Sequence, residues 1–115
     1  MTTSSTTICK KFRTICDRLC VKPEDYGKRA SVLRHNRAMD QLYKLTDSIS
    51  KNDILTVTVF KELLDDSDVT TRYYAAIHAH RLGVLTENSE RIVESVAQSK
   101  VYDERLLASE AQMLL

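Results

Sequence analysis

Apolar residues recur every three or four positions along most of this 115-residue chain, which is the spacing of amphipathic helices. The spacing predicts a first helix over residues 5–21, which Pro23 ends because the residue before a proline avoids the helical region. A longer second helix is predicted over 27–50. The expected inward residues of the first helix are Ile8, Phe12, Ile15, Cys16, Leu19 and Cys20; those of the second are Val32, Asn36, Met39, Leu42, Tyr43 and Ile49.

Residues 54–64 carry two patterns at once. Alternation with β-branched residues over 56–59 favours a strand, whereas Leu55, Val59, Phe60 and Leu63 continue the helical spacing. Asp53 is a suitable N-cap residue, which favours a helix. We expect a helix here, and a strand over 54–60 stays open as the alternative.

Three further helices are predicted, over 69–82, 88–100 and 103–114. The acidic turn 65–68 precedes the first of them, and Gly83 follows it at the position where glycine commonly ends a helix. The inward residues of the last two are expected to be Ile92, Val93, Val96, Ala97, Leu106, Leu107, Ala111 and Leu114. The pattern predicts one all-α domain over 1–115, with about six helices whose short connections favour antiparallel neighbours. Its parts are an N-terminal basic helix (1–22), a long helix (27–50) and a helical repeat region (54–115).

The helix over 69–82 can be divided into faces at 100° per residue. Apolar and small residues cover more than half of its circumference, so we expect it to be enclosed by neighbouring helices, with His80 in the core. The residues left to face water are Thr70, Tyr74, His78 and Arg81. An exposed tyrosine beside these cationic groups is typical of a binding anchor, so Tyr74 is a candidate contact residue.

Composition and charge narrow the functional class. With two glycines and one proline, the chain lacks the turns of a many-stranded β fold and the glycine cluster of a phosphate-binding loop. Residues 1–44 have a net charge of +6 and residues 45–115 of −5, so a charged partner can be steered to either half. No apolar run is long enough for a membrane span and no secretory signal is recognised. Three cysteines, an odd number, favour a reducing compartment, and we expect a cytoplasmic protein.

The stretch 63–76 resembles a HEAT-type helical repeat, in which paired leucines end one helix, an acidic turn follows, and Val-Arg with small residues opens the next. Asp66, Asp68, Arg72, Ala75 and Ala76 match this pattern, whereas Thr71 stands where the family usually has valine. Upstream, Gly27 and the run 35–42, with Asn36-Arg37 and Asp40, resemble the long first helix of a small bacterial HEAT-like family of uncharacterised function. The resemblance covers roughly residues 25–100. It implies a HEAT-like stack of antiparallel helices that binds proteins, and some members of the family act as immunity proteins of contact-dependent growth inhibition systems.

The reactive residues have structural interpretations. Cys9, Cys16 and Cys20 lie on one side of the first helix without the paired spacing of a zinc site, so we expect core cysteines. His78 and His80 are two apart and point to different faces of a helix, which makes a metal pair unfavourable. Asn36 is expected to bond a neighbouring helix end, and Arg72 to bond the acidic turn at Asp66 or Asp68. No motif has catalytic spacing, so we expect no enzyme, cofactor or metal.

Three functional hypotheses follow. The leading one is an immunity protein that occludes a toxin domain, expected to be a nuclease with a basic cleft; its partner-binding residues would be Tyr74, His78, Arg81, Glu87, Glu90, Glu94, Asp103 and Glu104. The second is a HEAT-like scaffold or regulatory adaptor for another protein. The third is a nucleic-acid adaptor, whose candidate phosphate contacts are Lys10, Lys11, Arg13, Arg18, Lys28, Arg29, Arg34 and Arg37. No membrane partner is expected.

Overall fold

The computed structural model describes residues 4–19, 23–25, 27–101 and 104–114, and these residues form only helices and connections. The α-helices are α1 (Ser5–Leu19), α2 (Arg29–Ile49), α3 (Asp53–Leu63), α4 (Val69–Arg81), α5 (Thr86–Ala97) and α6 (Arg105–Leu114), and a short 3-10 helix, η1, spans Pro23–Asp25. Within these ranges no strand occurs. The predicted all-α fold with about six helices is confirmed.

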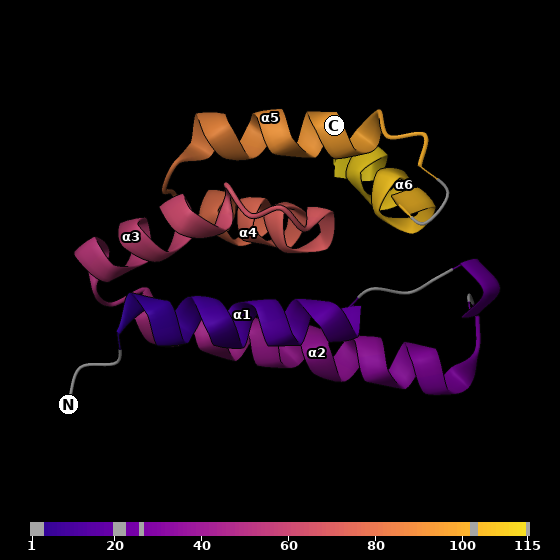
Figure 1. Cartoon of the computed structure of the whole chain (residues 1–115), viewed down its shortest axis with the longest axis horizontal. Helices are drawn as coiled ribbons and strands as arrows, with labels where there is room; N and C mark the ends of the chain where they lie inside the picture. The colour runs from indigo at the N-terminus through magenta and orange to yellow at the C-terminus, as the bar shows by residue number, and fades with distance from the viewer. Residues whose placement is uncertain (1–3, 20–22, 26, 102–103, 115) are drawn as a thin grey trace.

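The helices are arranged in layers, and each α-helix runs roughly opposite to the one before it (Figure 1). In this view α1 and α2 form the lower layer, α3 and α4 the middle, and α5 with α6 the upper one. The Cα atoms extend over 42 × 29 × 21 Å. The two ends of the chain therefore contribute to opposite sides of the molecule, with α4 between them.

Helix α4 is enclosed by its neighbours. It packs against α1, α3 and α5, and eight of its 13 residues are buried. Ala75, Ala76 and Ala79 have no exposed surface, and their small side chains let the neighbouring backbones approach closely. The expectation that this helix is sandwiched between others is confirmed.

Local capping explains where the central helices begin and end. The Asp68 carboxylate accepts the Thr71 amide at 3.0 Å and so caps α4 at its start. At its end Gly83 adopts a φ of +75°, and the amides of Gly83 and Val84 donate to the carbonyls of His80 and Ala79. This is a Schellman motif, which favours glycine because of its positive φ.

Residues 54–60 are helical, which decides between the two alternatives for this segment. The N-cap of α3 is Asn52, whose side-chain oxygen accepts the Leu55 amide at 3.0 Å, while Asp53 is the first helical residue. The buried Thr56 hydroxyl is within 2.8 Å of the carbonyl oxygens of Ile49 and Asn52, so its polar group is satisfied inside the helix turn. Val59 and Phe60 are fully buried, as the helical spacing requires.

The predicted inward face of α2 was partly wrong. Asn36 is exposed rather than buried, and Val32 and Tyr43 are also largely exposed. The first turns of α2 extend beyond the end of α1, so less of the molecule covers them (Figure 1). The residues of α2 that are buried are Ala38, Leu42, Thr46 and Ile49. Because this buried row includes the small Ala38 and the polar Thr46, a search for large apolar residues does not find it.

The last two helices, α5 and α6, differ less from the predicted bounds and inward residues. Helix α5 begins at Thr86 instead of residue 88, after Leu85, which takes a left-handed φ of +47°. Its Val96 and Ala97 are buried, and Ile92 and Val93 are half-buried. In α6, Leu107 and Ala111 are buried as predicted, but Leu106 and Leu114 are exposed. As the outermost helix, α6 has neighbours on one side only.

Substituting Ala76 by leucine tests the close packing of α4. Because Ala76 is fully enclosed, we expect A76L to lower the free energy of unfolding by about 1–3 kcal/mol through overpacking. The same enlargement at exposed Ser95 of α5 (S95L) is the control and should change stability by less than about 0.5 kcal/mol. Urea denaturation followed by circular dichroism measures both. Equal effects of the two variants would contradict a tightly enclosed α4.

Candidate functional site

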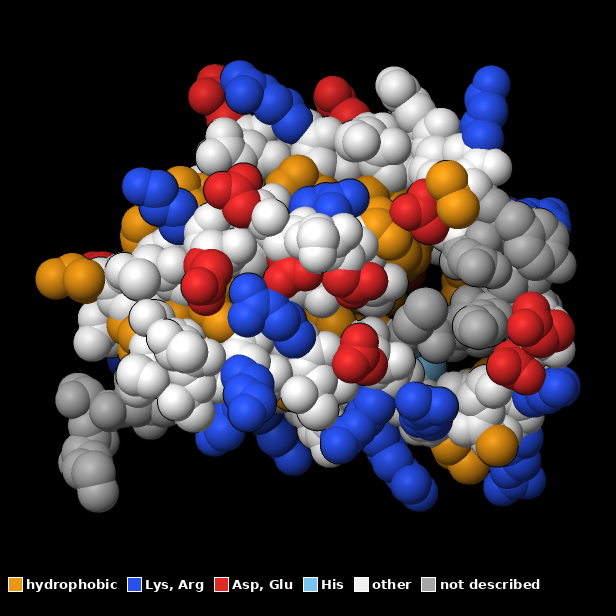
Figure 2. Space-filling model, viewed as in Figure 1, with side chains coloured by type: hydrophobic (Ala, Val, Ile, Leu, Met, Phe, Trp, Pro, Cys, Tyr) orange, Lys and Arg blue, Asp and Glu red, His pale blue; other side chains and the backbone are white. Residues whose placement is uncertain are grey.

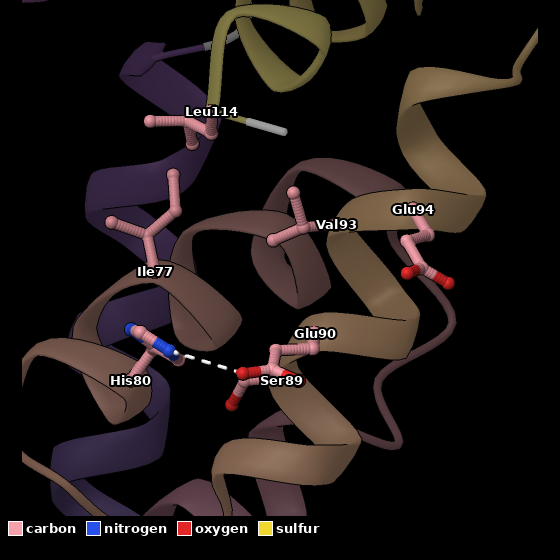
Figure 3. A pocket seen from close by; sticks show the side chains of 7 residues that line it. All are labelled: Ile77, His80, Ser89, Glu90, Val93, Glu94 and Leu114. Carbon is pink, nitrogen blue, oxygen red and sulfur yellow. Dashed lines mark ion pairs between the residues drawn. The ribbon is translucent and has the colours of Figure 1, made fainter.

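A cleft of about 420 Å³ opens between α4, α5 and the end of α6 (Figure 3). Ile77, Val93 and Leu114 point toward one another and make its apolar part. Its other lining residues are His80, Ser89, Glu90 and Glu94. The cleft therefore combines an aliphatic surface with two carboxylates, a combination suited to a ligand that is both apolar and cationic.

The polar edge of the cleft is formed by His80 and Glu90. The His80 Nε2 atom lies 3.4 Å from the Glu90 carboxylate, a distance that makes an ion pair when the imidazole is protonated. Both side chains are more than half exposed, so the expectation that His80 lies in the core is wrong. The apolar spacing of α4 indicated the face that carries His80, but not that this face opens into the cleft instead of being covered by a helix.

Acidic residues follow α5 on one face. Glu87, Glu90 and Glu94 are spaced three and four residues apart, so successive turns bring their side chains to the same side. Within the described ranges, neither the Glu87 nor the Glu94 carboxylate forms an ion pair or hydrogen bond. In Figure 3 the Glu94 carboxylate points away from the aliphatic side chains. Three of the residues predicted to bind a partner are thus brought together along this helix.

Tyr74, the predicted contact residue, is buried in the core. Its hydroxyl donates to the Glu110 carboxylate of α6 at 3.3 Å, and its ring meets that of Tyr73 edge to face at 5.1 Å. Burial, followed by the charge of Glu110, raises the pKa of both tyrosines. The prediction failed because α6 covers the face of α4 that carries Tyr74, and α6 is distant in sequence.

His78 is also buried, although it was expected to face water. Its ring packs edge to face on Tyr43 of α2 at 4.8 Å, so α2 covers this part of α4. The Arg81 guanidinium donates to the His78 Nδ1 atom at 3.4 Å, which makes Nδ1 an acceptor and places the ring proton on Nε2. Burial, reinforced by the charge of Arg81, lowers the pKa of His78 to about 4. The ring is therefore neutral near pH 7.

Arg81 joins α4 to α2 rather than projecting freely from the surface. Its guanidinium donates to the Thr46 hydroxyl at 2.8 Å and to the Asp47 carboxylate at 3.0 Å. The guanidinium carbon also lies 4.9 Å from the centre of the Tyr43 ring, within cation–π distance. The spacing of His78 and Arg81 placed both residues on one face of the helix, but it did not indicate that α2 packs against that face.

The remaining predicted contact residues lie near the start of α6. The Glu104 carboxylate accepts a hydrogen bond from the Ser99 hydroxyl, so it is engaged within the α5–α6 connection. Asp103 lies outside the described residues. Glu104 does not line the cleft.

The acidic turn before α4 is held by two arginines, of which the sequence suggested one. Arg72 donates to the backbone carbonyls of Asp66 and Ser67 at 2.8 and 3.0 Å, and not to a carboxylate. The Asp66 carboxylate is instead bound by Arg13 of α1 at 2.5 Å. Burial alone would raise the pKa of Asp66, but the hydrogen bonds from Arg13 and the Asp68 amide outweigh it and hold this pKa below its usual value.

The cysteines are core residues where the structure describes them. Cys9 and Cys16 have no exposed surface, and burial raises the pKa of both thiols, that of Cys9 to about 12. Both are therefore protonated and shielded from solvent at neutral pH. Cys20 lies outside the described residues. Across the described part of the chain, no cluster of three or more His, Cys, Asp or Glu side chains could hold a metal ion.

The chain matches no protein-family model, no curated protein and no solved structure. Among the described helices, none has both the length and the apolar character needed to cross a bilayer.

Substituting His78 by glutamine tests the buried, neutral histidine. Because the pKa of His78 falls from about 6.5 when unfolded to about 4 when folded, the unfolded chain binds an extra proton between these pH values. Acidification from about pH 7 to pH 4.5 should therefore remove roughly 2–3 kcal/mol of stability from the natural protein through this group. In H78Q this component should be absent, so its stability should depend less on pH.

The control for this experiment is H80Q, which removes an exposed histidine from the same helix. It should retain the pH dependence of the natural protein. Urea denaturation at both pH values provides the free energies. If H78Q and the natural protein lose the same stability on acidification, the neutral state of His78 is not what links folding to pH.

Proposed function

We propose that this protein is a binding module, and that the cleft between α4, α5 and α6 receives a basic, partly aliphatic segment of a protein partner. The observation that carries the proposal is a cleft whose lining combines Ile77, Val93 and Leu114 with Glu90 and Glu94. Aliphatic side chains of the partner would cover the apolar part, and Lys or Arg would meet the acidic edge. Binding alone, without covalent chemistry, is the proposed activity.

The apolar part supplies affinity because the protein alone leaves it in contact with water. The Leu114 side chain is 59% exposed, and Met113, which precedes it, is 86% exposed. Covering apolar area contributes about 25 cal/mol per Å². A partner segment that fills the cleft would therefore gain energy from burial in addition to ion pairing.

The acidic edge, by which we mean Glu90 and Glu94 in the cleft lining together with Glu87 on the same face of α5, supplies selectivity for a cation. Glu87 and Glu94 have no competing partner within the described ranges, and Glu90 shares only an exposed contact with His80. Exposed ion pairs are worth about 0–1 kcal/mol, so a lysine or arginine of the partner can replace His80 at small cost. An acidic surface also accelerates the encounter with a basic one.

The partner that best fits this surface is a toxin domain with a basic nucleic-acid cleft, which would make the chain an immunity protein. Two observations support this choice: the acidic edge along α5, and the resemblance of residues 63–76 to a HEAT-type repeat, a class of protein-binding scaffold. A nuclease cleft must be basic to hold phosphates, so an acidic helix complements it. Neutralisation would follow from occlusion, over an interface of about 1,600 Å².

Charge reversal at the cleft tests the proposal. We expect E90K/E94K to weaken partner binding at least tenfold at physiological salt, since each reversal replaces an attraction by a repulsion. The matched control, E24K/D65K, makes the same change in net charge at exposed residues outside the cleft, and it should bind within threefold of the natural protein. The partner is isolated on the tagged natural protein from source cells, identified by mass spectrometry, and titrated with each variant by calorimetry.

A growth assay separates an immunity protein from a scaffold. The recovered partner expressed alone should arrest growth, co-expression with the natural chain should restore growth, and co-expression with E90K/E94K should not. A partner that is harmless alone would overturn the immunity role while leaving the cleft as a docking site. A partner bound equally by both double variants, or recovery of no stoichiometric protein, would overturn the cleft proposal itself.

A further inference from the structure

A second surface, on the side of the molecule opposite α5, is lined by cations. The outer faces of α1 and α2 enclose two adjoining hollows of about 540 and 560 Å³, which share Arg18 and Gln41. The described charged residues in their lining are Lys10, Lys11, Arg18, Arg34 and Arg37, and none of the described lining residues is a carboxylate. We refer to this surface as the basic groove. In Figure 2, Lys and Arg side chains gather along the lower edge of the molecule, where α1 and α2 lie.

The cations of the basic groove lack anionic partners. The Arg18 guanidinium donates to the neutral Gln41 side chain at 3.1 Å, and within the described ranges the other four make no side-chain hydrogen bond or ion pair. Elsewhere on the same helices and beside them, cations are neutralised: Arg13 binds Asp66, and Lys28 binds Asp25 at 3.0 Å. The structure therefore separates the paired cations from the unpaired ones, which the sequence could not do.

The arrangement of these charges is unfavourable for the protein alone. Arg34 and Arg37 are three residues apart on one face of α2, and Lys10 and Lys11 are adjacent on α1. Like charges three residues apart on a helix, as Arg34 and Arg37 are, repel by a few tenths of a kcal/mol. An anion that lies between the two helices would relieve this repulsion along the whole groove at once.

We propose that the basic groove binds the phosphodiester backbone of a nucleic acid. A phosphodiester backbone carries one negative charge per nucleotide, so it can contact cations on both walls of the groove in any register. An acidic peptide would instead need carboxylates at matching positions. The planar guanidinium groups of Arg18, Arg34 and Arg37 suit bidentate phosphate contacts. The groove is concave, so a flexible chain reaches its floor and a flat bilayer does not.

The lining of the basic groove also indicates how a nucleic-acid strand would be recognised. Its uncharged polar residues include Thr7 and Gln41; the Gln41 side-chain NH2 group, whose oxygen accepts from Arg18, can donate to a phosphate oxygen. Among the described residues, no aromatic side chain lines either hollow, so these residues would not hold bases by stacking. Binding should therefore be independent of sequence and strongly dependent on salt.

Fluorescence anisotropy with labelled oligonucleotides tests the groove. The probes are a single-stranded uridine RNA of about 12 nucleotides, a thymidine DNA of the same length and a duplex of about 20 base pairs. If three to four phosphates are neutralised, the plot of log K against log salt between roughly 50 and 250 mM should have a slope of about −2 to −3 for the single strands. Comparison of the three probes shows which form of the backbone is preferred.

The groove variant is R18Q/R34Q/R37Q. We expect it to weaken binding at least tenfold at about 50 mM salt and to make the slope shallower by about 2, since three phosphate contacts are lost. The matched control, K61Q/R91Q/K100Q, removes three exposed cations outside the groove and should lose less than threefold. Circular dichroism melting establishes that both variants are folded.

A gain of binding gives an independent readout. Asp17 and Asp40 are exposed on the same two helices beside the groove, so D17N/D40N should bind about two- to fourfold more tightly. Binding within error of the natural protein by the groove variant, no binding of any probe at about 50 mM salt, or tighter association with phosphatidylserine vesicles than with nucleic acid would each overturn the proposal. The affinity of E90K/E94K for these nucleic-acid probes should remain within threefold of that of the natural protein. Failure of the cleft proposal and failure of the groove proposal are therefore distinguishable.

Discussion

The enclosure of α4 by helices on every side is the constraint on which the rest of the structure depends. Its alanines allow α1, α3 and α5 to approach, and its larger residues reach further: Tyr74 to Glu110 on α6 and His78 to Tyr43 on α2. Every other α-helix is thus positioned against one central helix. Where α4 faces α5 and the end of α6, Ile77 and His80 form one side of the cleft.

The layered order of the helices also separates the charges. The basic residues 1–44 form α1 and most of α2, and the acidic residues 45–115 form the end of α2 and the helices α3 to α6. Opposite charges on adjacent layers would partly neutralise each other, as Arg13 and Asp66 do. Because the cations of the basic groove on α1 and α2 lie on the opposite side of the molecule from the carboxylates of α5, the protein keeps a basic groove and an acidic cleft although its net charge is only +1.

The sequence was informative about elements and less so about faces. Helical spacing located all six helices within a few residues, and it favoured helix correctly where Thr56 and Val59 also allowed a strand. The same spacing misassigned Tyr74, His78 and His80. The apolar spacing of α4 predicted that the face carrying Tyr74 and His78 would contact water. In the structure α6 and α2 cover that face. The Tyr74 hydroxyl bonds Glu110 and the His78 ring packs on Tyr43, and both of these partners are more than 30 positions away, which no local pattern reveals.

The sequence by itself determined the all-α class, the caps at Asp68 and Gly83, and the division of charge between the two halves of the chain. These features depend on backbone hydrogen bonds and residue type within a few positions. Only the tertiary structure decided which charges remain available. It placed Arg13 against Asp66 and Arg81 against Asp47, but left Arg34, Arg37 and Glu94 without partners within the described ranges. Ion pairing requires atoms within about 4 Å of each other, and for residues distant in sequence that proximity is set by the packing of whole helices.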